Sequence, residues 1–300
     1  MKSSAEAFVS TAGTEKSRAA VVADLIKARL TALVLLTTFV GFYLGERGPV
    51  NFLLMFHALF GTALVASGAA ALNQFLERDY DARMRRTVTR PLPSGRMQPA
   101  TAAIFGGLCS VVGLVYLAVL VNPLTAVLGA VTSVSYLFIY TPLKRVTWIN
   151  TLVGAIPGAL PPLMGWTASR NELSGEGWAL FAILAFWQIP HFMAIAWLYR
   201  EDYAKAGFVM LPSAEDGDRR TGQHAVANTL ALLAASLCPF VFGLNGKIYL
   251  VASLVLGLGY LVCAIRFAQQ LDQRRARQLF LASIIYLPLL IAALVGNKLN

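Results

Sequence analysis

The sequence predicts an all-α polytopic membrane protein with nine transmembrane helices, on the strength of three observations. Hydrophobic residues make up 57% of the 300-residue chain and charged residues only 13%, whereas about 25% charged residues is usual for a soluble domain. The apolar residues are gathered in runs of about 20, the length at which a helix spans a bilayer. The charged residues fall mainly between these runs.

The apolar runs define the domain organisation. No polar stretch is long enough to form a separate soluble domain, so residues 22–300 are predicted to form a single membrane domain behind a short cytoplasmic N-terminal tail, residues 1–21. That tail lacks the apolar segment of a secretory signal. The nine runs lie at residues 24–45, 52–76, 99–120, 123–141, 149–167, 177–198, 223–243, 248–267 and 278–297.

The distribution of basic residues predicts the orientation of the chain. If the N-terminus and every second loop share one side, that side collects 21 of the 25 Lys and Arg residues. The positive-inside rule then places the N-terminus in the cytoplasm and the C-terminus outside. Basic residues confined to such loops suit an anionic membrane lipid surface and argue against a nucleic-acid partner. The short N-terminal tail favours a bacterial cytoplasmic membrane over a mitochondrial one.

Three polar residues are spaced along one face at the end of the second predicted helix. Asn73, Glu77 and Asp81 follow the pattern i, i+4, i+8, which confines them to an arc of about 80° over about 12 Å of helix. One amide and two carboxylates are oxygen ligands of the kind that Mg²⁺ takes. The alternative is a charged helix end at the lipid headgroups, a reading that fits Asp79, which points toward Arg83. A buried amide at Asn73 needs a partner and favours a binding site.

Basic residues close to this arc predict an anion partner. Arg86 and Arg90 are an i, i+4 pair if the helix continues, and arginine binds phosphate oxygens in a bidentate manner. Lys144 and Arg145 lie beside Tyr140 at another helix end on the same side of the membrane. The alternative for each is an ordinary positively charged loop. With a diphosphate and Mg²⁺ present, these basic residues and the carboxylates would all be used.

A further polar group lies within an apolar run. Gln188 and His191 flank Pro190, which kinks a helix and frees a carbonyl. Asp202 follows on the next cytoplasmic segment and is a further ligand candidate. A polar residue within a span predicts function, although a lone histidine in an apolar helix is often a buried group with a structural partner.

These residues resemble a known family. The segment "NQFLERDYDARMRRTVTRPLPSG" resembles the first acidic motif of the UbiA-type intramembrane prenyltransferases. Together with "YTPLKRVTWINTLVGAIPGALPPLMGW" and "WQIPHFMAIAWLYREDYAKAGFVMLP", it is similar to the protoheme IX farnesyltransferase (heme O synthase) family, and the resemblance covers nearly all of residues 22–297. Two departures stand out. Glu77 replaces the more common Asp, and Asp202 is followed four residues later by Ala206 rather than by a second Asp.

The resemblance implies a fold, an activity and partners. The fold would be nine transmembrane helices around a central cavity capped by cytoplasmic loops. The activity would be transfer of a farnesyl group from farnesyl diphosphate to a vinyl group of heme B, giving heme O for terminal oxidases. Heme A synthase or oxidase assembly proteins are implied as protein partners. His191 would bind the heme iron or orient a propionate.

The implied site has two sets of residues. A set that holds Mg²⁺ and the diphosphate would act in catalysis, and a second set would contact the substrates. The first set is Asn73, Glu77, Asp81, Arg86, Arg90, Lys144 and Arg145, with Asp202 as a further metal ligand; the second is Tyr140, Gln188, His191 and Asp202.

Two other functions share part of this pattern. A prenyltransferase for an aromatic acceptor, such as a quinone precursor, shares the first motif but predicts a fuller second acidic motif than "REDYAKAG". A membrane transporter predicts charged residues near the middle of the membrane. Here the charges are concentrated at one membrane surface, and only Gln188 and His191 lie deeper.

Overall fold

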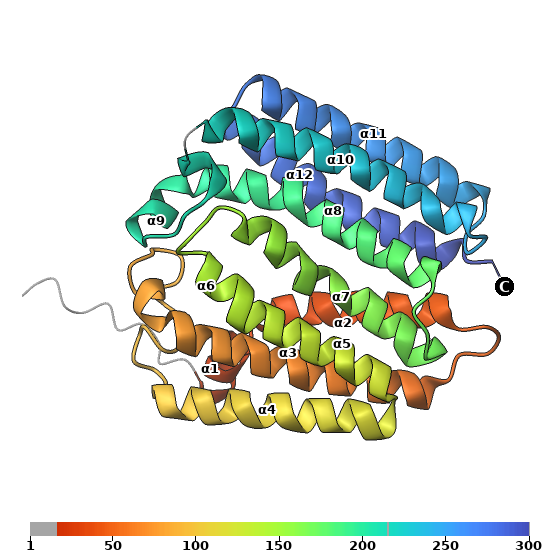
Figure 1. Cartoon of the computed structure of the whole chain (residues 1–300), viewed down its shortest axis with the longest axis horizontal. Helices are drawn as coiled ribbons and strands as arrows, with labels where there is room; N and C mark the ends of the chain where they lie inside the picture. Colours follow the sequence, from red (N-terminus) through yellow and green to blue (C-terminus); the bar gives the residue numbers. More distant parts are fainter. Residues whose placement is uncertain (1–16, 215, 300) are drawn as a thin grey trace, which may run out of the picture.

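The computed structural model describes residues 17–214 and 216–299, and within these ranges the regular secondary structure is helical, apart from one isolated β-bridge between Asn245 and Lys298 (Figure 1). The predicted all-α class is therefore confirmed. The α-helices are α1 (Arg18–Leu25), α2 (Ala28–Gly45), α3 (Phe52–Asp81), α4 (Pro99–Leu120), α5 (Pro123–Val134), α6 (Thr141–Leu143), α7 (Asn150–Arg170), α8 (Gly175–Leu198), α9 (Arg200–Lys205), α10 (Gly217–Val241), α11 (Lys247–Gln269) and α12 (Gln273–Gly296). A π-helix, η1 (Ser135–Tyr140), joins α5 to α6, and a 3₁₀ turn, η2 (Leu211–Ser213), precedes α10.

Each of the nine predicted segments coincides with a long helix or, for 123–141, with the continuous α5–η1–α6 unit. Eight of these helices in the described ranges are long and apolar enough to cross a membrane. The ninth, α7, falls outside that set and carries prolines at positions 157, 161 and 162. The chain is thus a multi-pass membrane protein, whereas the count of nine crossings and the orientation of the termini stay predictions.

The N-terminal region differs from the prediction. Residues 1–16 of the expected tail lie outside the described residues, but Arg18 already begins α1, so the helical part of the chain starts earlier than residue 22. The expected continuous helix 24–45 is broken between α1 and α2. Lys27 has a φ of 50°, in the left-handed region, and the Gln74 side-chain amide donates to the carbonyls of Asp24 and Leu25 at the end of α1. A polar residue of α3 therefore stabilises the break.

Small residues allow the helices to approach closely. A Cβ at Gly165 of α7 would collide with the backbone of Thr38 on α2, and a Cβ at Gly41 would collide with the backbone of Pro162 on α7. Close packing through small residues is usual where helices associate within a bilayer. It places α2 against α7, so that both helices can line the interior of the bundle.

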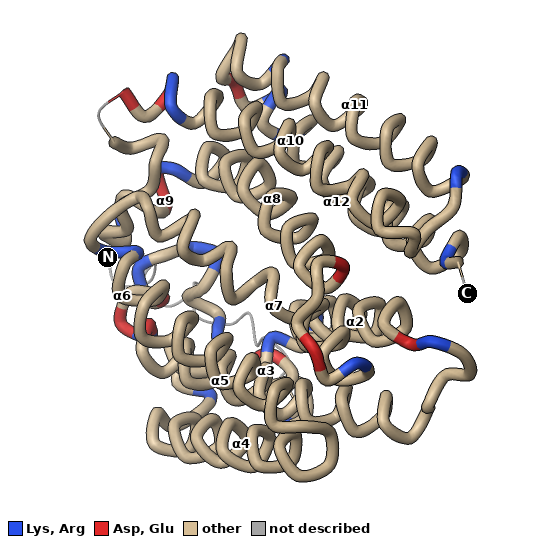
Figure 2. Tube along the Cα trace, turned by 45° about the vertical axis from the view of Figure 1, so that its right-hand side comes forward, with Lys and Arg blue, Asp and Glu red and all other residues tan. Residues whose placement is uncertain are grey.

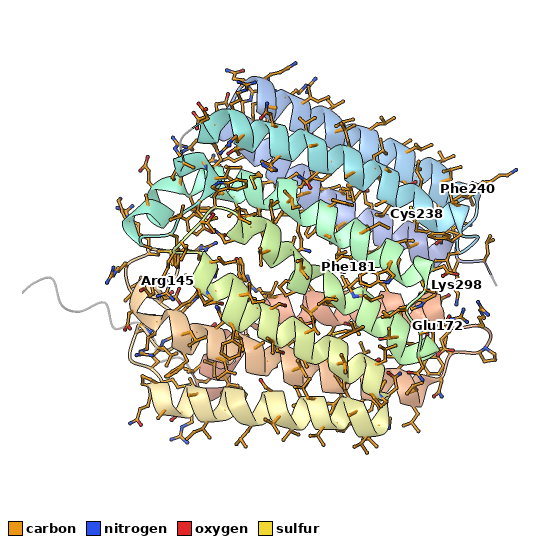
Figure 3. All side chains as sticks on the ribbon, viewed as in Figure 1. Arg145, Glu172, Phe181, Cys238, Phe240 and Lys298 are labelled. Atoms are coloured by element: carbon orange, nitrogen blue, oxygen red, sulfur yellow. The ribbon has the colours of Figure 1, made fainter. Side chains whose placement is uncertain are left out.

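The C-terminal segment contacts the end of α2. Lys298 Nζ donates to the carbonyls of Tyr43 and Glu46, each at 2.7 Å. These acceptors belong to the end of α2, where helix carbonyls otherwise lack partners. Figure 3 shows Lys298 and Glu172 at the end of the bundle opposite Arg145. The contact links the last residues of the chain to the first long helix.

Apolar and charged residues are separated along the bundle axis. Large apolar side chains on the outer helices are exposed, for example Val119 of α4 at 73% and Ile248 of α11 at 74%, as expected for a lipid-facing surface. Along α11 and α12 the charged residues lie near the helix ends, and α4 carries none (Figure 2). The loops that follow α3, α6, α8 and α11 share one end of the bundle (Figure 1).

Candidate active site

Two cavities meet inside the bundle. The smaller has a volume of about 90 Å³ and is lined by Glu77 and Asp81 at the end of α3. The larger has a volume of about 380 Å³ and is lined mainly by apolar side chains of α2, α3, α7 and α8. Lys27, Tyr140 and Lys144 line both cavities. A polar compartment therefore adjoins an apolar one, with two lysines at the junction.

The predicted face of α3 points inward. Asn73 is fully buried, Glu77 is 5% exposed and Asp81 is 1% exposed, whereas the Asp79 side chain is 73% exposed. The helical spacing thus separates the three residues of the arc from their acidic neighbour. Asp79 lies 3.7 Å from Arg78 Nε, so the pairing expected with Arg83 is wrong; the guanidinium of Arg83 lies over the ring of Tyr80 instead.

Each member of the arc is held by a cation from a different segment. One cation comes from the break between α1 and α2, one from the residue after α6, and one from the turns after α3. Charge-assisted bonds of this kind are stronger than neutral ones. The bonds are Lys27 Nζ to Asn73 Oδ1 at 2.7 Å, Lys144 Nζ to Glu77 Oε1 at 2.8 Å, and Arg90 Nη1 to Asp81 Oδ2 at 2.6 Å.

Lys27 lines both cavities and is the residue of this candidate site that the sequence did not single out. It is a single lysine at the start of an apolar run, and its role depends on the left-handed turn that directs it inward. Its Nζ also donates to the Tyr136 hydroxyl at 3.2 Å. The only signal in the sequence was a charge inside a segment read as a membrane span.

The Lys144 ammonium lies close to two aromatic rings. Its Nζ lies 4.5 Å from the centre of the Tyr140 ring and 5.9 Å from that of Phe208. Although burial disfavours the ammonium, the neighbouring Tyr140 and Glu77 raise the pKa of Lys144 above its usual range. Tyr140 stacks on Tyr136, with ring centroids 5.7 Å apart. Lys144 is therefore a fixed positive charge at the junction of the two cavities.

The carboxylate of Asp81 keeps one oxygen free. Arg90 bonds Oδ2, whereas Oδ1 is buried and has no hydrogen-bond partner. Such an atom carries a desolvation penalty unless a cation or donor reaches it. Together with Glu77, which also lines the smaller cavity, it offers the hard oxygen donors that Mg²⁺ takes, so the two carboxylates fit a divalent cation. Asn73 lines neither cavity, and its Oδ1 accepts from Lys27. The described residues contain no group of three or more His, Cys, Asp and Glu arranged to hold a metal, so other oxygens must complete its coordination.

Of the other charged residues predicted for the site, Arg86 lines the smaller cavity, whereas Arg145 and Asp202 line neither cavity. Arg86 lines the smaller cavity and donates to the Tyr203 hydroxyl at 3.1 Å. The helix does not continue as the i, i+4 pairing of Arg86 and Arg90 assumed: α3 ends at Asp81, and both arginines reach the site from the turns that follow it. Arg145 donates to the Tyr80 hydroxyl at 2.8 Å and lines neither cavity. Asp202 lines neither cavity either, whereas its neighbour Tyr203 lines the smaller one.

Gln188 and His191 line the larger cavity. The Gln188 amide donates to the Leu184 carbonyl at 3.0 Å. A Cβ at Gly158 would collide with Gln188 Oε1, so the glycine makes room for this side chain on α7. The apolar cavity thus contains two polar groups on α8, both at positions predicted from the sequence.

Comparison with known proteins gives a consistent result. The model of the UbiA prenyltransferase family matches residues 34–287. The protoheme IX farnesyltransferase of Solibacter usitatus is 45% identical over 92% of this chain and 97% of its own. The protein of the same name from Myxococcus xanthus is 46% identical over 93% of this chain and 95% of its own.

Solved structures share the fold. A digeranylgeranylglyceryl phosphate synthase aligns with a TM-score of 0.80 at 15% identity, covering 93% of this chain and 98% of its own. A UbiA homologue from Archaeoglobus fulgidus, solved with GPP and Mg²⁺, aligns with a TM-score of 0.65 at 15% identity, covering 92% and 99%. The family match and the close relatives, each covering most of the chain, settle membership: this chain belongs to the UbiA prenyltransferase family.

Proposed function

We propose that this protein transfers a farnesyl group from farnesyl diphosphate to a vinyl group of heme B, giving heme O for terminal oxidases. The observation that carries the proposal is the junction of a cation-rich polar cavity with an apolar cavity of about 380 Å³, at which Lys27, Tyr140 and Lys144 line both. A prenyl diphosphate has the same two parts, a charged head and an apolar chain. The name of relatives that are 45% identical over 92% of this chain, protoheme IX farnesyltransferase, indicates heme as the acceptor substrate.

The polar cavity would hold the diphosphate. Arg86, Arg90 and Lys144 line it and would bind the phosphate oxygens. Asn73, Glu77 and Asp81 would hold Mg²⁺, which when bound neutralises the charge of the leaving group, as expected for the family of which one member was solved with GPP and Mg²⁺. Preorganised charges at the point where negative charge develops are usually the largest contribution to catalysis.

The apolar cavity would receive the prenyl chain and the acceptor. Breaking the bond between farnesyl C1 and oxygen leaves the electron pair on the diphosphate and a cation on the allylic carbons. The apolar walls and the Tyr136–Tyr140 stack would keep water from this cation. The π electrons of the heme vinyl group then form the new bond to C1. Water adds to the resulting cation and loses a proton, which leaves a hydroxyl group on the product.

A direct assay tests this function. Purified protein with heme B, farnesyl diphosphate and Mg²⁺ is expected to give a farnesylated hydroxyethyl heme by mass spectrometry. Turnover is expected to stop when EDTA is added and to return with Mg²⁺. Product with 4-hydroxybenzoate, but none with heme, would instead assign an aromatic acceptor.

We also propose a location and a topology. The protein would lie in the bacterial cytoplasmic membrane as one domain over residues 22–300, crossing it nine times with a cytoplasmic N-terminus. The crowding of basic residues at one end of the bundle supports this (Figure 2). A C-terminal alkaline phosphatase fusion is expected to be active and a C-terminal fluorescent protein fusion to be dark. The opposite pair of results would mean that the chain crosses the membrane an even number of times or that its orientation is reversed.

Lys27→Met is expected to lower kcat/KM for farnesyl diphosphate by about 10- to 100-fold, since a hydrogen bond to a charged group contributes about 1.5–3 kcal/mol. The lysine lines both cavities and would reach the diphosphate where the head meets the chain. The KM for heme should stay within about twofold. The measurement is a steady-state titration of each substrate.

Arg29→Met is the matched control, because Arg29 is an exposed cation two residues further along the chain. Removing it takes away the same charge from the same end of the bundle and should leave both constants unchanged. Equal losses in the two variants would mean that the general positive field, rather than Lys27 itself, supports the reaction.

A further inference from the structure

The contacts of His191 allow its ring proton to be assigned to one nitrogen. His191 Nδ1 lies 2.7 Å from Ser283 Oγ on α12. Ser283 Oγ in turn donates to the Phe280 carbonyl at 2.5 Å. A hydroxyl has one hydrogen to donate, so Ser283 must accept the bond from His191. With Ser283 donating to the Phe280 carbonyl, the proton is assigned to Nδ1 and Nε2 carries a lone pair.

The ring is also held in one orientation. It lies between two aromatic rings, with the centroid of Trp187 at 5.0 Å and that of Phe280 at 5.1 Å, inclined at 20° and 27°. The Trp187 indole N–H donates to the Ser283 carbonyl at 2.9 Å. Within the described part of the chain Nε2 has no hydrogen-bond partner, and it is not among the buried unpartnered atoms. It is therefore accessible from the larger cavity, which His191 lines.

Two parts of a heme could meet this nitrogen, the iron or a propionate. An ionised propionate offers only lone pairs, and Nε2 in this tautomer also offers a lone pair, so a propionate bond would require the ring proton to move to Nε2. Iron accepts a lone pair, and neutral imidazole is its usual protein ligand in heme sites. Ligating histidines almost always donate their second ring N–H to a fixed acceptor, which is the role that Ser283 has here.

We infer that His191 Nε2 binds the iron of heme B in the larger cavity, and that Ser283 is a positioning residue that fixes the tautomer and the ring. The inference rests on the proposed function, which supplies heme as the acceptor substrate. His191 lies seven residues before the end of α8 and Asn73 eight before the end of α3, so both are about 10–12 Å from the same end of the bundle. Iron ligation would thus hold the porphyrin at the depth of the diphosphate site.

The test is spectroscopic and needs no farnesyl diphosphate. Purified protein is titrated with hemin, and the ferrous complex is examined by resonance Raman for an iron–histidine stretch. Wild-type protein is expected to show it, and His191→Ala to lose it and to regain a six- or five-coordinate imidazole spectrum when free imidazole is added. Ser283→Ala is expected to bind hemin about 10- to 100-fold more weakly, and Ser283→Thr, which keeps the hydroxyl, to recover most of this loss.

His57 and His224 are the matched controls, since the chain has only three histidines. His57 Nδ1 also bonds a hydroxyl, that of Tyr116 at 2.7 Å, yet neither control residue lines the larger cavity. Their alanine variants should keep the iron–histidine stretch. Should His191→Ala not fold, as judged by gel filtration, His191→Gln decides, since it keeps a polar side chain of similar size.

The result separates this inference from the proposed function. An iron–histidine stretch that survives in His191→Ala, or is absent from wild-type protein that still farnesylates heme, would overturn the ligation and leave the function standing. A stretch that depends on His191 in a protein that prenylates only an aromatic acid would overturn the function and leave the heme site standing.

Discussion

Asp81→Asn is expected to lower kcat by about 10²- to 10³-fold, the loss typical when one preorganised electrostatic group is removed from the point where charge develops. Asp81 is 1% exposed and lines the smaller cavity, with Oδ2 bonded to Arg90 and Oδ1 without a partner. The amide keeps the size of the side chain but removes its charge. The measurement is single-turnover farnesyl transfer at saturating heme and farnesyl diphosphate.

Asp79→Asn is the control from the same helical turn. Its side chain is 73% exposed and pairs only weakly with Arg78, at 3.7 Å, and surface pairs of this kind contribute about 0–1 kcal/mol. Its kcat should stay within about twofold of wild type. A raised Mg²⁺ requirement for Asp81→Asn, but not for Asp79→Asn, is expected as well. Equal losses would contradict the assignment of function to one face of α3.

The face of α3 could be predicted from the sequence because it depends on local geometry alone. The spacing of Asn73, Glu77 and Asp81 places them on one side of any helix, and the structure shows all three buried with Asp79 outside. The nine helical segments were predictable for a similar reason, since runs of apolar residues fix the length of a span. Both predictions require only that the chain be helical.

The partners of these residues could not be predicted in the same way. Lys27 meets Asn73 across 46 positions and Lys144 meets Glu77 across 67, and no periodicity connects such segments. Lys27 also depends on a left-handed residue that is not glycine, a conformation that few residues adopt. The partner assigned locally, Arg83 for Asp79, was wrong, because Arg78 lies closer.

The pattern of pairs shows how the site tolerates its own charge. In a protein interior an unpaired carboxylate costs several kcal/mol, and here Glu77 and Asp81 are each paired with a cation. The same cations line the cavity in which a diphosphate would lie. Binding a metal ion and a diphosphate together would therefore largely exchange partners, since the charge of the metal offsets most of the charge of the diphosphate. The arginines and lysines that neutralise the carboxylates are the groups that the anion would bind.

Lys144→Met tests this exchange and is expected to separate stability from activity. The Lys144 and Glu77 side chains are 16% and 6% exposed, and two bonds, at 2.8 and 3.1 Å, join them. Removing one partner of a buried pair leaves the other charge uncompensated and costs about 3–5 kcal/mol. Lys144→Met is expected to lose this much stability in an unfolding titration with sodium dodecyl sulfate in mixed micelles, and to lose farnesyl transfer about 10²-fold or more.

The double variant Lys144→Met with Glu77→Gln removes both charges. Because a pair replaced as a whole costs far less than a broken one, the double variant should unfold close to wild type, within about 1–2 kcal/mol. Its activity should not recover, since neither the cation for the diphosphate nor the carboxylate for the metal is present. Recovery of both properties would assign the pair to folding alone, and failure to recover stability would mean that Lys144 contributes through its contact with the Tyr140 ring rather than through Glu77.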